Sequence, residues 1–164
     1  MKSRAQAGFT LVELIVVIVI LGILAAVAVP RFMGLETEAR VAAVKSLGGT
    51  LKSAANMAHG VCMAQACATG TAITIEGQAV TFVNGYPDAA GISLLMQSTE
   101  GFTGTVTGAA NRFTKNGART TPNLCWVQYA QAASINAPPV ISYRRGAMTS
   151  ANEATINADL RVQC

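Results

Sequence analysis

Hydrophobic residues are concentrated near the start of the chain, and their distribution predicts its first element. Residues 9–29 form an apolar stretch that only Thr10 and Glu13 interrupt with polar side chains. As a helix, this stretch extends about 31 Å, which is just long enough to span a bilayer. Because Lys2 and Arg4 precede it, the positive-inside rule predicts a cytoplasmic N-terminus, with the rest of the chain outside.

After Pro30 the apolar pattern becomes periodic, which predicts that the helix continues along a folded domain. Apolar residues recur at spacings of three and four, at Val44, Leu47, Leu51, Ala54 and Ala58. A stripe of this kind faces a core. Proline has no backbone N–H and clashes with the preceding turn, so we expect a kink or a local break near residues 26–30. Gly22 and the Gly48-Gly49 pair weaken the helix further, by about 0.5–1 kcal/mol per glycine relative to alanine.

The second part of the chain changes to short alternating segments, which predict strands. Residues 71–83 alternate around Gly77, a pattern typical of a β-hairpin, and Asn84-Gly85-Tyr86-Pro87 then turns the chain. A short helix is expected at 89–97. Further strands are expected at 102–107, 111–114, 124–131, 139–145 and 158–163. The predicted fold class is α+β, with a long N-terminal helix laid on an antiparallel β-sheet.

Four cysteines, Cys62, Cys67, Cys125 and Cys164, form an even set. A chain that enters or crosses a membrane places them in an oxidising compartment, so two disulfides are expected. Three pairings are possible, and we favour Cys62 with Cys67 and Cys125 with Cys164. Residues five apart on a continuous α-helix are too separated to be bridged, so a Cys62–Cys67 bond requires the long helix to end or distort near Gly60.

Composition and charge narrow the classes of partner. The 164 residues suit one domain with an N-terminal extension, and 51% are hydrophobic while only 12% are charged. The formal net charge is +4, but without Lys2 and Arg4 ten basic residues stand against eight acidic ones. A mature charge of +2 is too small to indicate nucleic-acid binding.

Chemistry-bearing motifs are missing from the sequence. It contains no Gly-rich phosphate loop, no nucleophile elbow and no metal-ligand cluster. His59 is the only histidine and has no second ligand at helical spacing, so a surface or helix-end role is favoured. Near the C-terminus, Glu153 and Asp159 offer thin support for a calcium site, and a solvated loop is the favoured interpretation. We therefore expect no catalytic residue, no metal and no cofactor.

Glu13 is the unusual residue of the apolar stretch. A carboxylate inside a spanning helix costs about 2.5–3.5 kcal/mol near the bilayer centre and less near an edge, so it usually has a partner. A position shallow enough to reach the headgroups is the ordinary explanation. However, the N-terminus of this chain resembles that of type IV pilins. The resemblance rests on GFTLVEL after a short basic leader, with Phe9 directly after Gly8, and on the positions of Glu13 and Pro30.

The resemblance implies a division of the chain and a processing route. Residues 1–8 would be a leader that a prepilin peptidase removes after Gly8, with methylation of the new N-terminal Phe9. Residues 9–29 would be the transmembrane and filament-core helix, 30–60 an amphipathic helix packed on the head, and 61–164 a β-sheet head with disulfides. Glu13 would pair with the Phe9 amine of a neighbouring copy, and the stretch from Gly22 to Pro30 would melt on assembly.

The resemblance also implies partners and a location. The chain would assemble with itself into a helical homopolymer, using the pilus assembly machinery, after a stage in the bacterial inner membrane. The strand CWVQYAQA, the Pro-Pro turn and the terminal cysteine resemble the mannose-sensitive haemagglutinin branch of these pilins. Arg144 and Arg145 are candidate contacts for an unidentified surface or glycan ligand, and two ordinary exposed arginines are the alternative. The alternative function is that of a pseudopilin of type II secretion, although pseudopilins commonly lack these cysteines.

Overall fold

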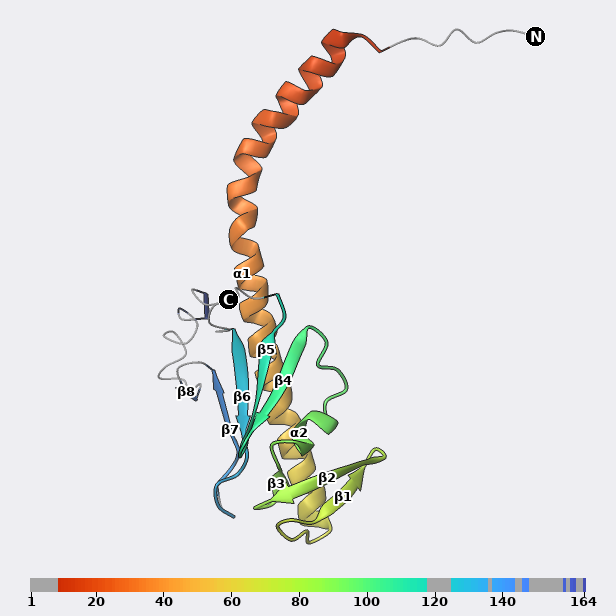
Figure 1. Cartoon of the computed structure of the whole chain (residues 1–164), viewed down its shortest axis with the longest axis vertical. Coiled ribbons are helices and arrows are strands. Elements are labelled where there is room, and N and C mark those ends of the chain that lie inside the picture. The colour runs from red at the N-terminus through yellow and green to blue at the C-terminus, as the bar shows by residue number, and fades with distance from the viewer. Residues whose placement is uncertain are drawn as a thin grey trace, which may run out of the picture. The chain divides into compact units, whose positions relative to one another are not determined.

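The computed structural model describes residues 9–117, 125–135, 137–143, 146–147, 158, 160–161 and 164. Its elements are α1 (Leu11–Ala64), β1 (Ala72–Ile75), β2 (Gln78–Val83), β3 (Tyr86–Pro87), α2 (Gly91–Leu94), β4 (Phe102–Thr107), β5 (Ala110–Lys115), β6 (Trp126–Ala130), β7 (Val140–Tyr143) and β8 (Gly146–Ala147). Residues up to 37 and residues 38–164 form two compact units (Figure 1).

The first unit contains the start of α1, an apolar helix without a covering surface. By length and composition α1 can cross a membrane, and none of its most apolar 18-residue window is buried. The helix is continuous through Pro30, so of the kink or local break expected near residues 26–30 the break is absent. Proline removes only one hydrogen bond of the ladder, and the turns on either side maintain the helix.

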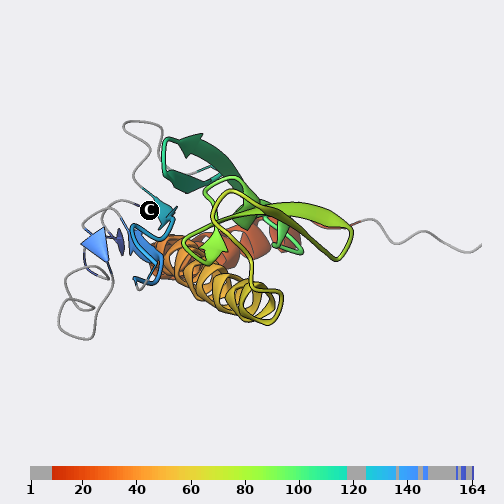
Figure 2. The ribbon, with the colours of Figure 1, turned by 90° about the horizontal axis from the view of Figure 1, so that it is seen from below.

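In the second unit, the rest of α1 packs against two antiparallel sheets. One has the order β1-β2-β3 and the other β4-β5-β6-β7-β8. Figures 1 and 2 show the strands gathered on one side of this part of the helix. Val44, Leu47, Leu51 and Ala58 are buried as the periodicity predicts, whereas Ala55 is fully buried and Ala54 only partly. The predicted α+β class is confirmed.

The core joins the helix stripe to the inward residues of the larger sheet. Alternate residues of β5 and β6 are buried, among them Phe113, Val127 and Tyr129. The Tyr129 hydroxyl donates a hydrogen bond to the Pro87 carbonyl over 2.7 Å, which satisfies its polar end inside the core. Burial raises the pKa of Tyr129 far above its usual value, so the phenol stays protonated.

Two tight turns set the smaller sheet. Glu76 and Gly77 both have positive φ between the paired residues Ile75 and Gln78, and Asn84-Gly85 repeats the arrangement between β2 and β3. Positive φ at both central positions defines the type I′ turn, whose twist matches that of paired strands. The predicted hairpin at 71–83 is therefore confirmed, as is the turn after it.

Most predicted strands of the larger sheet are confirmed, but the last one is wrong. The range 102–107 coincides with β4, while β5, β6 and β7 lie within one or two residues of the predicted ranges. The strand predicted at 158–163 is instead helical at Ala158, Leu160 and Arg161. The Cys164 N–H donates to the Leu160 carbonyl, four residues earlier, which is the helical pattern.

Candidate functional site: the N-terminal assembly segment

The start of α1 is closed by a reciprocal set of hydrogen bonds. The Thr10 N–H and hydroxyl both donate to Glu13 Oε2, over 2.9 and 2.7 Å, and the Glu13 N–H donates to Thr10 Oγ1 over 3.3 Å. Threonine followed three residues later by glutamate is the capping box, in which each side chain satisfies a backbone donor of the first turn. This role of Thr10 was not predicted from the sequence, although T-x-x-E before an apolar run is its signal.

The capping box changes the interpretation of Glu13. The carboxylate has a partner within its own chain, so it is not a bare charge when the chain is alone. A carboxylate in the first turn also lies at the positive end of the helix dipole, which favours its charged form. The same group remains open to an outside cation, because Glu13 is exposed in the single chain.

The other residues predicted for this segment are placed as follows. Gly8 lies outside the described residues. Phe9 is 79% exposed, immediately before the helix. Gly22 and Pro30 both lie inside α1, and nothing approaches within 4 Å of a Cβ built on Gly22. The structure therefore places Phe9 and Glu13 around the same first turn, while Gly22 and Pro30 lie further along the helix.

Large apolar side chains cover every side of this helix and are left exposed. Between Leu11 and Val29, the exposed ones include Leu14, Ile18, Leu21, Ile23 and Leu24. Soluble single chains rarely leave so large a continuous apolar surface open, and such surfaces mark membrane or protein contacts. The segment therefore needs lipid or other helices around it.

Two disulfides connect the second unit. Cys62 is bonded to Cys67 and Cys125 to Cys164, with Cα–Cα distances of 5.0 and 4.7 Å. This is the pairing that the sequence analysis favours, but α1 ends at Ala64 rather than near Gly60. The distortion lies between the cysteines and not before them.

The end of α1 explains how residues five apart can be bridged. Ala66 has a left-handed φ of 48°, the Cys67 N–H donates to the Cys62 carbonyl, and the Ala66 N–H donates to the Met63 carbonyl. This pair of bonds is the Schellman motif, which brings the residue after the left-handed position back over the last turn. In this chain a disulfide occupies the place of the usual apolar contact.

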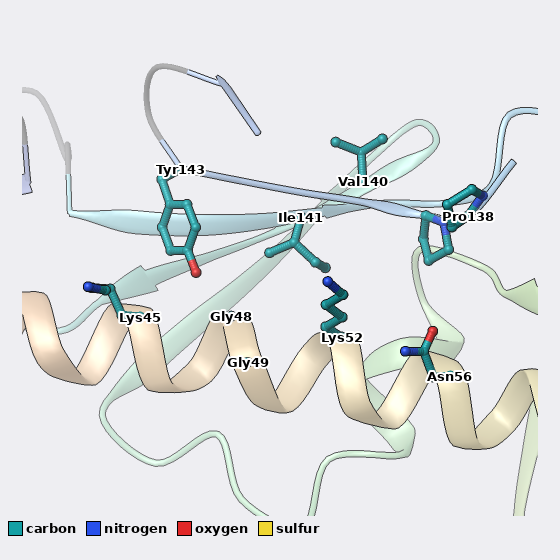
Figure 3. Close-up of a pocket in the computed structure, with 10 residues that line it drawn as sticks. Lys45, Gly48, Gly49, Lys52, Asn56, Pro138, Val140, Ile141 and Tyr143 are labelled. Atoms are coloured by element: carbon teal, nitrogen blue, oxygen red, sulfur yellow. The ribbon is translucent and has the colours of Figure 1, made fainter. Parts of the chain in front are cut away.

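A groove of about 510 Å³ runs along the second unit between α1 and β7 (Figure 3). Its lining comes from both elements and the loop before β7: Lys45, Gly48, Gly49, Lys52, Asn56, Pro138, Pro139, Val140, Ile141 and Tyr143. Tyr143 points from β7 toward the helix, as Ile141 does, while Val140 points away. The tyrosine ring packs on the buried Gly48, where a Cβ would lie 2.9 Å from Cζ. The glycine pair, expected only to weaken the helix, thus has one member with a packing role.

The groove carries no catalytic arrangement. Its ionisable residues are lysines and one tyrosine, and burial raises the pKa of Tyr143. Within the described part of the chain, no three His, Cys, Asp or Glu side chains gather as a metal site. His59 stacks on Tyr86 at 4.1 Å and its Nδ1 lies 2.7 Å from the Gly85 carbonyl, so it joins the helix to the β2–β3 turn. The predicted contacts Arg144 and Arg145, and the tail residues Glu153 and Asp159, lie outside the described residues.

Known proteins share both the N-terminal segment and much of the chain. Residues 3–29 match the prokaryotic N-terminal methylation motif. The fimbrial protein EcpC of Eikenella corrodens is 34% identical over 115 residues, or 68% of this chain and 74% of that protein. The type II secretion system core protein G of Pseudomonas aeruginosa is 53% identical over 45 residues, 27% of this chain and 32% of that protein.

A type IV narrow pilus major component of Thermus thermophilus is 53% identical over 47 residues, which are 29% of this chain and 40% of that protein. No solved structure gives a significant match. The similarity to EcpC extends over most of both proteins, and the methylation motif coincides with the exposed apolar helix and its capped glutamate. The chain therefore belongs to the type IV pilin family of fimbrial proteins, and it is a structural subunit rather than an enzyme.

Proposed function

We propose that this chain is the repeating subunit of a type IV pilus that attaches cells to surfaces. The observation that carries the proposal is the uncovered apolar helix with Glu13 in its first turn. A helix that is apolar all round is stable in lipid or among other helices, but not in water. One surface can therefore serve two states, first in the inner membrane and then in the core of a filament.

The processing route explains the position of Glu13. A prepilin peptidase would cleave after Gly8 and methylate Phe9, and the methylation motif at residues 3–29 supports this step. Cleavage creates a positively charged amine at Phe9. In the filament, Glu13 would then exchange part of its bonding to Thr10 for the Phe9 amine of a neighbouring copy. Charges attract strongly away from water and an unpaired one is penalised, so the pair would fix the axial register.

The N-terminus of the mature protein is the direct test of this route. Mass spectrometry of protein isolated from the cell surface should give a chain that begins with methylated Phe9. A chain that begins after Ala28 would instead indicate an ordinary secretory signal, and it would remove the assembly segment from the mature protein.

The stretch from Gly22 to Pro30 is proposed to extend during assembly. Gly22 has a low helix propensity and Pro30 leaves one carbonyl of α1 without its backbone donor, so this stretch costs little to unwind. The structure holds it as a helix in the single chain. After polymerisation, hydrogen exchange should become faster within residues 22–30, while residues 9–21, which the filament covers, should exchange no faster than in the free chain.

A pseudopilin of type II secretion is the second candidate, supported by the match to core protein G. The four cysteines of the head, joined in two disulfides, favour the first candidate. Among type IV pilins, the strand CWVQYAQA, the Pro138-Pro139 turn and Cys164 favour the mannose-sensitive haemagglutinin branch. Electron microscopy of cells that express the chain separates the two functions. Long surface fibres that an antibody to this chain decorates support the pilus. Short periplasmic structures together with a secretion defect in the deletion strain support the pseudopilin.

A further inference from the structure

The outward face of the larger sheet carries a row of polar side chains that the assembly function does not use. In β5, Asn111 and Phe113 are buried, so Arg112 between them faces away from the core. The register places Thr105 of β4 and Gln128 of β6 on either side of Arg112. A hollow of about 450 Å³ lies over this row, lined by Thr105, Thr107, Ala110, Arg112, Thr114 and Gln128.

Arg112 is held in position by its neighbours. Its guanidinium Cζ lies 4.5 Å from the centre of the Trp126 ring, and its Nη2 donates to Gln128 Oε1 over 3.4 Å. Stacking on an aromatic ring orients the planar guanidinium while leaving N–H donors available. The planar group is therefore oriented before any ligand arrives.

The charge on this face is not neutralised within the sheet. Strands β4, β5, β6 and β7 contain no Asp or Glu, and their two cations are Arg112 and Lys115. Lys115 is committed elsewhere, because its Nζ donates to the Gly101 carbonyl over 3.1 Å and lies over the Phe102 ring. An exposed guanidinium among hydroxyl groups, with no Asp or Glu in its own strand or in the described strands beside it, is complementary to an anion.

The other residues that line the hollow indicate which class of anionic ligand fits it: a protein segment, a nucleic acid or a saccharide. A protein segment needs aromatic or aliphatic anchors at the centre of its binding surface, and among the described residues that line this hollow the only apolar one is Ala110. A nucleic-acid strand is bound through several cations, whereas the described lining of this hollow contains one, Arg112. Three threonine hydroxyls and one amide suit a ligand rich in hydroxyl groups.

We propose that this face binds an acidic saccharide, a sugar that carries a carboxylate. The Arg112 guanidinium donates two parallel, charge-assisted hydrogen bonds to the two oxygens of the carboxylate. The hydroxyl groups of the sugar form hydrogen bonds with three threonine hydroxyls and one amide, those of Thr105, Thr107, Thr114 and Gln128. A role for this binding in attachment rests on the pilus function proposed above, whereas the binding itself does not.

The chain contains its own probe, because Trp126 is its single tryptophan and lies under Arg112. Full-length protein in detergent micelles is titrated with oligogalacturonate while Trp126 emission is recorded. The matched ligand is the same oligosaccharide with its carboxylates methyl-esterified, which keeps the hydroxyl groups and removes the charge. We expect saturable binding of the acid and about tenfold or more weaker binding of the ester, the usual strength of one charge-assisted hydrogen bond.

Variants locate the binding on the chain. Arg112→Gln should abolish the difference between acid and ester, and Thr105→Val, which keeps the shape of the side chain, should weaken binding of both. Lys52→Gln removes the same charge from the groove beside α1 and should change neither affinity. Circular dichroism checks that each variant is folded. If Arg112→Gln does not fold, Thr105→Val still tests whether the ligand binds at this face.

Several outcomes overturn the proposal. Equal binding of acid and ester excludes the carboxylate contact, and equal losses in Arg112→Gln and Lys52→Gln indicate diffuse attraction. Binding of a duplex oligonucleotide but not of oligogalacturonate assigns the face to nucleic acid instead. Because the titration uses unassembled chain, its failure is distinct from a failure to form pili.

Discussion

The two halves of α1 differ both in apolar content and in what covers it, and the more apolar half is the exposed one. From residue 11 to residue 29 the large side chains are exposed, for example Ile15 at 46% and Ile23 at 63%, whereas Val44 and Leu51 further along are fully buried. The second half packs against sheets of its own unit, whereas none of the most apolar window of the first half is buried in the part of the chain that the structure describes. Burial within one chain thus depends on a partner surface as much as on hydrophobicity.

The pattern of each half matches its surroundings. The first half is apolar all round, which suits contact on every side, while the second half has one stripe that faces one core. The positions of the polar residues differ between the halves in the same sense. The first half has Glu13 at its beginning, held by Thr10, and the second half exposes Lys52 and Asn56 to solvent. The first half is therefore built for contacts between molecules and the second for contacts within one.

The largest expected effect comes from removing the charge in the first half. Glu13→Gln keeps the capping box, since the glutamine amide oxygen can also accept from the Thr10 N–H, but without a charge it cannot form an ion pair with a neighbouring amine. We expect it to insert into the membrane normally and to yield almost no filaments, and we expect the same of Glu13→Val. Sheared-fibre yield and membrane content by immunoblot measure the two steps.

Thr10→Ala is the matched control for the cap. It removes the capping side chain, at a cost of about 1 kcal/mol to the helix start, and leaves the Glu13 charge in place. Filament yield should fall only slightly. If Glu13→Gln assembled normally while Thr10→Ala did not, the glutamate would serve the cap and not the register.

The second half should be sensitive instead to its covalent links. Replacing Cys125 and Cys164 together by alanine opens a link across 39 residues, and the loop-entropy model predicts a loss of about 3–4 kcal/mol in the free energy of unfolding. The Cys62–Cys67 link spans only five residues, and its removal should cost about 2 kcal/mol. Guanidinium unfolding of the full chain in detergent, followed by Trp126 emission, measures both. Equal losses would contradict the entropic account.

The sequence predicts the helix and hairpins well because their signals are local. Apolar periodicity, the turn residues Glu76-Gly77 and Asn84-Gly85, and the alternation in β4 to β7 each lie within a few residues. The apolar stripe was displaced only at Ala54 and Ala55. The failure at 158–163 has a tertiary cause, because the disulfide from Cys125 fixes Cys164 while Leu160 packs into the core. Such long-range constraints override the alternation of a short segment.

The residues of the candidate sites also differ in whether local sequence signals or long-range contacts determine their positions. Phe9 and Glu13 were predicted from the resemblance of the N-terminal motif to type IV pilins, and the disulfide pairing was favoured among three possible ones. T-x-x-E could have identified Thr10 as well. The Arg112–Trp126 pair could not be predicted, because the two residues meet only through the register of β5 with β6. The contact of Tyr143 with Gly48 likewise depends on how the sheet packs on α1.

The adjacent glycines of the second half should respond in opposite directions to the same substitution. Gly48→Ala places a methyl group against Tyr143, and overpacking of this kind costs about 1–3 kcal/mol. Gly49→Ala meets nothing within 4 Å and should stabilise the helix by about 0.5–1 kcal/mol. Thermal melting of the two variants, with near-ultraviolet circular dichroism as the signal, compares them directly. Equal shifts would mean that helix propensity alone governs both positions.

The smallest effect concerns the end of the second half. Ala66 has a left-handed backbone conformation, which costs about 1–2 kcal/mol for a residue with a Cβ and which glycine adopts freely. Glycine loses more chain entropy on folding, but this opposing cost is smaller, about 0.5–1 kcal/mol. Ala66→Gly should therefore stabilise the chain by about 0.5–1 kcal/mol. The gain should persist in the Cys62→Ala/Cys67→Ala background if the Schellman motif forms without the disulfide. If the gain disappears there, the covalent bond and not the hydrogen bonds imposes the left-handed residue, and the motif is a consequence of the link.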